Sequence, residues 1–349
     1  MIIYQFRMKI NWKGIFRAVL FLGLGVFLVA YAINGLGESE MRQMKDAFGN
    51  AEYSWLYASI LLGILGHWLR ALRWNILIEP LRKEKTDVVY TLGAVMTGYL
   101  ANLAVPRLGE VTRCGVLSRY EKISFTTLIG TVITERLTDM LLVVLFTIVN
   151  VWFEYSEVYG FFKSKVLLPL TNKFSTINPV HIILFVLAGV LLFFLLKKWL
   201  AKKNENSAGD NKVKNFIKGL EEGVRSFRKM KRPGLFIFYS ILIWVSYWLS
   251  SWICFFAFGE TCHLGLGAGL SVLTFGSFAM IAVQGGIGAY PLMVMLILQE
   301  YNIDKATGLA YGWINWSGQF LLILAGGFFS LLFLPAYESR RKKSKMGGS

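Results

Sequence analysis

Residues 101–139 read ANLAVPRLGEVTRCGVLSRYEKISFTTLIGTVITERLTD, and this stretch places charge inside otherwise apolar sequence. Its first charged residues follow a run apolar enough to enter a membrane, and Glu135, Arg136 and Asp139 fall in the middle of the next run. Each ionised group at the centre of a lipid-facing helix costs about 2.5–3.5 kcal/mol on insertion scales. We therefore expect these three side chains to face a protein interior or a cavity.

The composition is that of an α-helical membrane protein. Of the 349 residues, 55% are hydrophobic and only 17% are charged, whereas a soluble domain is about one quarter charged. Several runs of about 18 or more nearly uncharged residues predict an all-α polytopic protein that forms one transmembrane domain over residues 1–349. We expect about six spanning helices, near residues 15–34, 54–74, 124–153, 180–196, 235–258 and 307–334.

The net charge of +16 has a topological interpretation. Lys and Arg cluster between and around the apolar runs, and such clusters mark cytoplasmic loops, so no nucleic-acid partner is predicted. The segment 197–232 holds twelve basic and four acidic residues and has the strongest cytoplasmic signal. Apolar residues recur there at helical spacing and predict a basic amphipathic loop over 201–233 that lies on the inner leaflet.

Counting the crossings from that loop leaves two segments that enter and leave the membrane on one side. Residues 86–123 must begin and end at the cytoplasmic face, with a break at 102–109, where Pro106 interrupts the helical ladder. Residues 265–300 must begin and end outside, with a break at 284–288 and a shorter arm after Pro291. Both are predicted to be re-entrant hairpins of broken helices. In the alternative topology, residues 86–104 cross the membrane fully.

This order of elements occurs twice, in opposite orientation. Residues 1–153 and 154–339 each contain two spanning helices, a broken hairpin and a further spanning helix. An inverted repeat whose broken helices meet near the midplane is a signature of transporters. Both termini are then cytoplasmic. The basic N-terminal stretch that ends in Ala30-Tyr31-Ala32 also resembles a signal peptide with a cleavage site, and the alternative is an uncleaved first helix.

The polar residues around the first hairpin are candidate ligands for an anionic headgroup. They are Asn102, Arg107, Glu110, Arg113, Glu135, Arg136 and Asp139. Asp139 is expected to pair with Arg136, three positions before it on the helix. One interpretation of the set is a buried ion network that holds the hairpin in place. The other is a polar cavity in which arginine, whose planar fork suits bidentate binding, holds a phosphate.

Arg70 and Arg73 extend this list, because residues three apart share one face of a helix. Either they anchor the helix at the membrane interface together with the flanking tryptophans, or they clamp a lipid phosphate.

The second half offers uncharged candidates, namely Gln284, Gly285, Gly286, Gly288, Asn315 and Gln319. The glycine-rich break exposes backbone N–H groups next to the N-terminus of the following helix, an arrangement that suits an anion. The amides of Asn315 and Gln319, four positions apart, either line the same cavity or hydrogen bond between helices. The three cysteines and three histidines are scattered, so the sequence predicts no disulfide, metal site or cofactor.

Four stretches together resemble one family. They are RALRW at 70–74, GYLANLAVPRLGEVTR at 98–113, ERLTD at 135–139 and QGGIG at 284–288. The chain resembles the transmembrane region of the lysylphosphatidylglycerol synthases, the flippase-like module of the multiple peptide resistance factor, over nearly its whole length. The family commonly reads Pro-Gly-Gly and then has an acidic residue, whereas this chain has Gln284 and then Ala289-Tyr290-Pro291.

The resemblance implies the transport half of that family, without the soluble domain that carries aminoacyl transfer. We expect a lipid translocase of a bacterial cytoplasmic membrane, not an enzyme, that moves a polar or anionic lipid between leaflets. One alternative is a membrane enzyme of the polyprenyl-linked transferase type, with Glu110, Glu135 or Asp139 as general base. Another is a non-catalytic partner of a membrane enzyme. The expected partners are a phosphate-bearing lipid and either a second copy of the chain or such an enzyme.

Overall fold

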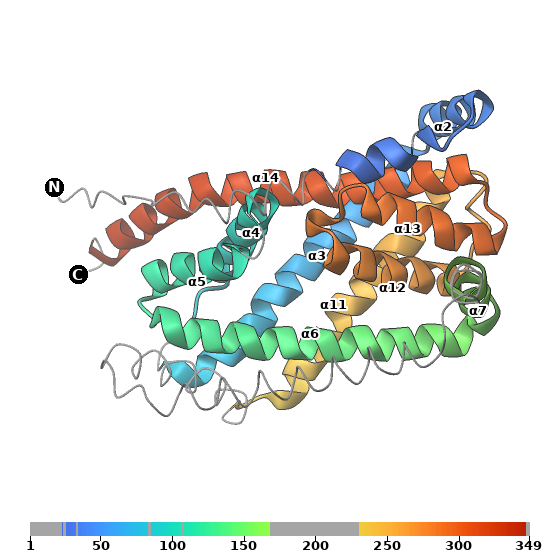
Figure 1. The fold of residues 1–349 in the computed structure, drawn as a ribbon. Helices are drawn as coiled ribbons and strands as arrows, with labels where there is room; N and C mark the ends of the chain where they lie inside the picture. The colour runs from blue at the N-terminus through green and yellow to red at the C-terminus, as the bar shows by residue number, and fades with distance from the viewer. Residues whose placement is uncertain are drawn as a thin grey trace, which may run out of the picture.

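The computed structural model describes residues 23, 26–32, 34–82, 85–105, 108–167 and 230–346. These residues form helices, and no strand occurs among them (Figure 1). The predicted all-α class is therefore confirmed for this part of the chain. The expected helix at 180–196 and nearly all of the expected loop at 201–233 lie outside the described residues, as does much of the expected helix at 15–34.

The elements follow one another as α2 (Glu38–Asn50), α3 (Tyr53–Ile78), η1 (Glu79–Leu81), α4 (Val88–Ala104), α5 (Leu108–Glu121), α6 (Phe125–Phe153), α7 (Tyr155–Phe161), η2 (Phe162–Leu167), α11 (Pro233–Ile253), η3 (Cys254–Ala257), α12 (Leu266–Ala282), η4 (Gln284–Gly286), α13 (Ala289–Leu298), η5 (Gln299–Tyr301) and α14 (Lys305–Met346). Three helical segments in the described part are long and apolar enough to cross a membrane: Tyr53–Leu81, Pro233–Ala257 and Lys305–Lys343. The 29-residue α6 is as long, and it carries the three charges singled out above.

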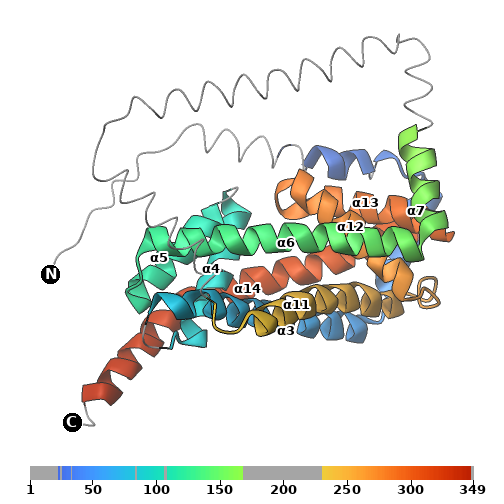
Figure 2. The same cartoon turned by 90° about the horizontal axis from the view of Figure 1, so that it is seen from below.

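Helices α3 and α11 run side by side (Figures 1 and 2). Small residues allow their close approach. A Cβ atom added at Gly66 of α3 would lie only 2.6 Å from Cε1 of Tyr247 on α11, and the hydroxyls of Ser59 and Ser250 are 2.8 Å apart. Close packing and interhelical hydrogen bonds at small residues are what hold helices together within a membrane.

Helices α4 and α5 form the first hairpin. Its two arms touch at glycines, since a Cβ atom at Gly98 would lie 2.8 Å from the carbonyl oxygen of Gly109. At the break, the Asn102 side chain accepts a hydrogen bond from the Gly109 N–H at 2.7 Å. At the open end, the Asp87 N–H donates to Glu121 at 2.9 Å. Both ends of this segment therefore lie together, as expected for a hairpin.

Helices α12 and α13 form the second hairpin. The break uses φ angles of +67° at Gly285, +68° at Gly286 and +71° at Gly288, which glycine adopts without a steric penalty. Helix α13 begins at Ala289, earlier than the expected start after Pro291. Pro291 thus falls in its first turn, where the missing N–H donor has no partner to lose.

The two hairpins occupy opposite ends of the bundle (Figures 1 and 2). Their long arms, α4 and α12, are both 17 residues long and both end at a valine, Val105 and Val283, in extended conformation. Their breaks approach each other, because a Cβ atom at Gly285 would lie 4.0 Å from Cδ2 of Leu103. The outer end of the second hairpin is tied to the end of α6, where the Tyr301 hydroxyl donates to Glu154 at 2.8 Å.

The last helix is longer than the expected 307–334, because it continues through Pro335 to Met346. Contacts with the start of the first hairpin hold this extension: the Tyr337 hydroxyl donates to Asp87 at 2.9 Å, and Arg341 lies 3.6 Å from the same carboxylate. A proline removes one backbone hydrogen bond, and these side-chain contacts offset that loss.

Candidate functional site

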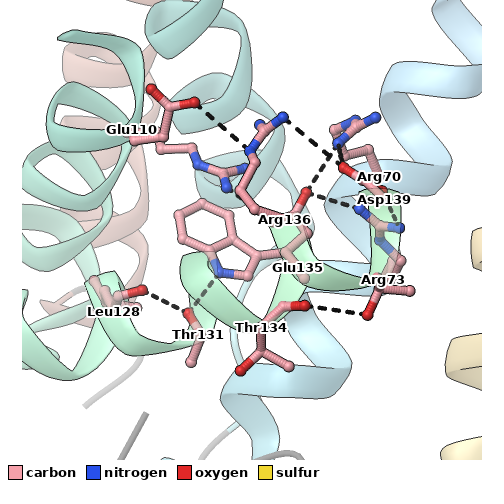
Figure 3. Close-up of polar contacts among 12 residues, drawn as sticks. Arg70, Arg73, Glu110, Leu128, Thr131, Thr134, Glu135, Arg136 and Asp139 are labelled. Carbon is pink, nitrogen blue, oxygen red and sulfur yellow. Dashed lines mark hydrogen bonds and ion pairs between the residues drawn. The ribbon is translucent and has the colours of Figure 1, made fainter. Parts of the chain in front are cut away.

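Two arginines of α3 face two carboxylates of α6 inside the bundle (Figure 3). Nη1 of Arg70 lies 3.1 Å from Glu135 and 2.8 Å from Asp139. Arg73 reaches Asp139 at 2.7 Å and Glu135 at 2.9 Å. The i,i+3 spacing on α3 and the i,i+4 spacing on α6 put each pair on one helix face, so the two faces meet through four charged side chains.

Arg113 of α5 supplies a third guanidinium group, with Nη2 at 3.0 Å from Glu135. Its Cζ atom lies over the ring of Trp74, 4.7 Å from the centroid. The indole N–H of Trp74 donates in turn to Thr131 at 2.9 Å. The first hairpin is thus bound to α3 and α6 through charge and through a cation–π contact.

These five charged side chains are buried: Arg73 and Glu135 have no exposed surface, and Arg70, Arg113 and Asp139 are 5%, 3% and 8% exposed. Together they form the charge cluster, which holds three guanidinium groups and two carboxylates and so has an excess of one positive charge. The Nε atoms of all three arginines are buried and have no hydrogen-bond partner among the described residues. The arrangement therefore has both the charge and the spare donors to accept an anion.

Arg136 and Glu110 form the rim of the cluster. Nε of Arg136 is 3.6 Å from Glu110, and the two side chains are 40% and 29% exposed. The expected pair of Arg136 with Asp139 is present at 3.9 Å, but the shorter partners of Asp139 are Arg70 and Arg73. The sequence missed those partners because they lie on another helix.

A small cavity adjoins the rim between the hairpin and α6. Its volume is about 10 Å³, and its polar lining consists of Tyr99, Asn102, Glu110, Arg113 and Arg136. This is room for about one water molecule, far less than a lipid headgroup occupies. The site is therefore closed.

The structure tests several of the site predictions made from the sequence. Interfacial anchoring of Arg70 and Arg73 is wrong, because both side chains are buried in ion pairs. Of the expected network, Glu110 and Arg113 are present, whereas Arg107 lies outside the described residues. Ser240, whose hydroxyl is 3.3 Å from Nη1 of Arg73, was not anticipated, since a lone serine in an apolar helix carries no sequence signal.

The candidates of the second half do not line this cavity. Asn315 donates to the hydroxyls of Tyr290 and Tyr311, at 3.0 and 3.3 Å. Gln319 donates to Ser250 of α11 at 3.2 Å. The alternative of hydrogen bonding that ties α14 to its neighbours is therefore observed. A role of the two amides as substrate ligands stays a prediction. Tertiary packing turned these amides toward α11 and α13.

Some backbone groups of the glycine-rich break at 284–288 already form hydrogen bonds within the protein. The N–H of Gly286 donates to the carbonyl of Val283 at 2.9 Å, and the carbonyl of Gly285 accepts from the Trp316 indole at 2.7 Å. Gly288 immediately precedes α13, and the side chain of Gln284 lies outside the described part. An anion-binding role for this break stays a prediction.

Long apolar helices around a buried charge cluster define an integral membrane protein. The sequence matches the family described as the lysylphosphatidylglycerol synthase TM region over residues 15–340, and the chain belongs to that family. It is similar to the UPF0104 membrane protein MJ1595 of Methanocaldococcus jannaschii, with 21% identity over 304 residues that cover 85% of this chain and 88% of that protein. No solved structure matches the chain. The family resemblance seen in the sequence is thus confirmed.

Proposed function

We propose that this protein moves an anionic lipid between the leaflets of a membrane without changing the lipid chemically. The observation that carries the proposal is the buried charge cluster, whose three arginines outnumber its two carboxylates. An uncompensated positive charge is costly inside a membrane bundle. An anionic headgroup would neutralise it and would occupy the spare Nε donors.

Arg136 and Glu110 give the headgroup a route from the side. Their contact is long and partly exposed, and beyond Arg136 the outer face of α6 carries Leu137, Met140 and Leu141, which are 56%, 66% and 72% exposed. Lipid acyl chains cover such a face in a membrane. A lipid can thus keep its chains against α6 while its headgroup replaces Glu110 beside Arg136.

The second element of the proposal is the inverted repeat formed by residues 1–153 and 154–339, with re-entrant hairpins at 86–123 and 265–300. Support comes from the equal lengths and matching ends of α4 and α12 and from the approach of the two breaks. Transporters of this architecture expose a central site to each side in turn. Because the cavity is closed here, we propose that the first hairpin moves relative to α6 to admit the headgroup.

The test is a lipid-translocation assay in proteoliposomes with labelled anionic, zwitterionic and lysyl lipids. Wild type is compared with Arg113→Gln, Arg136→Ala and Glu135→Gln, each checked for folding, and with Arg42→Ala on the exposed surface of α2 as the control. We expect wild type to move one anionic lipid selectively. The cluster variants should lose this movement, and the control variant should keep it. Movement of no lipid would overturn the proposal, and chemical conversion of the lipid would replace it with an enzyme.

A further inference from the structure

His67 is a buried titratable side chain that the charge cluster does not use. It lies on α3, one turn before Arg70, and is 7% exposed. Neither of its ring nitrogens has a hydrogen-bond partner among the described residues. Native proteins rarely bury a polar group in this way without a functional or structural reason.

The surroundings of His67 connect it to the cavity. Its ring is 5.0 Å from the ring of Tyr99 on α4 and 6.2 Å from that of Tyr247 on α11. Tyr99 itself lines the cavity beside Arg113 and Arg136. From α14, the neutral Gln319 contacts Gly63, one turn away from His67. The charged group nearest to His67 along α3 is Arg70, whose carboxylate partners belong to α6.

Charge counting then separates two classes of headgroup. A phosphodiester, with one negative charge, balances the single excess positive charge of the cluster. A phosphomonoester carries about −1.5 to −2 at pH 7, and its dianionic form leaves one negative charge in excess. One proton would restore neutrality, and imidazole is the side chain whose charge ordinarily changes between pH 5 and 8.

We propose that the site binds a lipid phosphomonoester together with one proton, which His67 takes up. The inference rests on the proposed function and names its substrate class and its coupling ion. Protonated His67 donates from both ring nitrogens, and the arriving phosphate oxygens, or a water beside them, supply the missing acceptors. Transport of such a lipid is then linked to the proton gradient.

Calorimetric titration of the purified protein in nanodiscs tests this at pH 7.5. The probe is dioctanoyl phosphatidic acid, titrated in two buffers with different ionisation enthalpies so that bound protons are counted. We expect uptake of about one proton per lipid, and none with dioctanoyl phosphatidylglycerol, the phosphodiester. His67→Gln should abolish the uptake and weaken phosphatidic acid binding about tenfold while leaving phosphatidylglycerol binding unchanged. His263→Gln, on an exposed loop, is the control.

Three results overturn the inference while the proposed function stands: no proton uptake by wild type with phosphatidic acid, uptake that persists in His67→Gln, or equal weakening of both lipids. The first needs no variant and holds even if His67→Gln fails to fold. Binding of glycerol 3-phosphate as tightly as phosphatidic acid would assign the site to a soluble phosphate instead. Binding of neither lipid would count against the proposed function itself.

Discussion

Nη1 of Arg73 lies 2.7 Å from Oδ1 of Asp139, although 66 positions separate the two residues in the chain. The pair joins α3 to α6 where the Arg73 side chain is fully buried and the Asp139 side chain is 11% exposed. Removal of one partner of a buried ion pair leaves the other charge uncompensated, which costs about 3–5 kcal/mol. The pair therefore gives the first prediction.

Arg73→Ala is expected to lower the free energy of unfolding by about 3–5 kcal/mol, as measured by denaturant titration in detergent micelles. The double variant with Asp139→Ala should lose less than the sum of the two single losses, because neither charge then stays unpaired. Arg42→Ala is the control, since its pair with Glu38 is 79% and 94% exposed, and it should cost less than about 1 kcal/mol. If the losses of unfolding free energy at Arg73 and Asp139 are additive, the two side chains do not form the ion pair seen in the structure.

Glu110 competes with a lipid phosphate for Arg136 in the proposed function. Glu110→Gln removes that competitor and increases the excess positive charge, so affinity for an anionic lipid should rise about fivefold, which corresponds to roughly 1 kcal/mol. Binding is measured by titration of a short-chain anionic lipid. Glu38→Gln on α2 serves as the matched neutral exchange and should leave affinity unchanged. A loss of affinity in Glu110→Gln would make Glu110 part of the binding site instead.

Gly109 lies where the two arms of the first hairpin touch. An added Cβ atom would collide with the carbonyl oxygen of Gly98, which is backbone and cannot turn away. Gly109→Ala should therefore destabilise the protein by about 1–3 kcal/mol through overpacking. Gly115→Ala on the same helix meets nothing within 4 Å and should be neutral or slightly stabilising, since alanine favours helix. Thermal unfolding of the two variants checks the contrast, and equal behaviour would refute it.

Gly285 tests the conformation of the second break, where φ is +67° and an added Cβ atom has space, with its nearest neighbours 4.0 Å away. Any penalty at this position comes from the backbone alone. Gly285→Ala should cost about 1–2 kcal/mol, and Gly285→Asn less, because asparagine tolerates the left-handed region. Gly265→Ala, at φ −80° with nothing within 4 Å, is the control. The midpoints of denaturation check this: Gly285→Ala should have the lowest midpoint, followed by Gly285→Asn and then by the control Gly265→Ala.

Cys262 is exposed, whereas Cys114 and Cys254 are buried. Since α11 leads away from the basic segment 197–232, the loop that carries Cys262 should face outside. A membrane-impermeant maleimide is expected to label Cys262 in intact cells and to spare the other two cysteines. Ser339→Cys in a Cys262→Ser background should be labelled only after permeabilisation. If the cysteine at position 339 is labelled in intact cells and Cys262 only after permeabilisation, the topology is the opposite of the one predicted.

The sequence by itself determined the helical membrane class, the family and the positions of both hairpin breaks. These follow from local causes: long apolar runs demand helices, Asn102 and Gly109 flank an interrupted ladder, and only glycine takes positive φ at Gly285 without strain. The charges at Glu135 and Asp139 likewise predicted a buried polar site, because ionised side chains that face lipid are energetically costly.

Only the tertiary structure decided which partners those charges have. Local spacing pointed to Arg136, yet the close partners of Asp139 are Arg70 and Arg73, because α3 crosses α6 at that level. The same packing turned Asn315 and Gln319 away from the cavity. Helical periodicity tells which side chains share a face, but the neighbour of that face depends on how several helices pack at once, and no single helix encodes that.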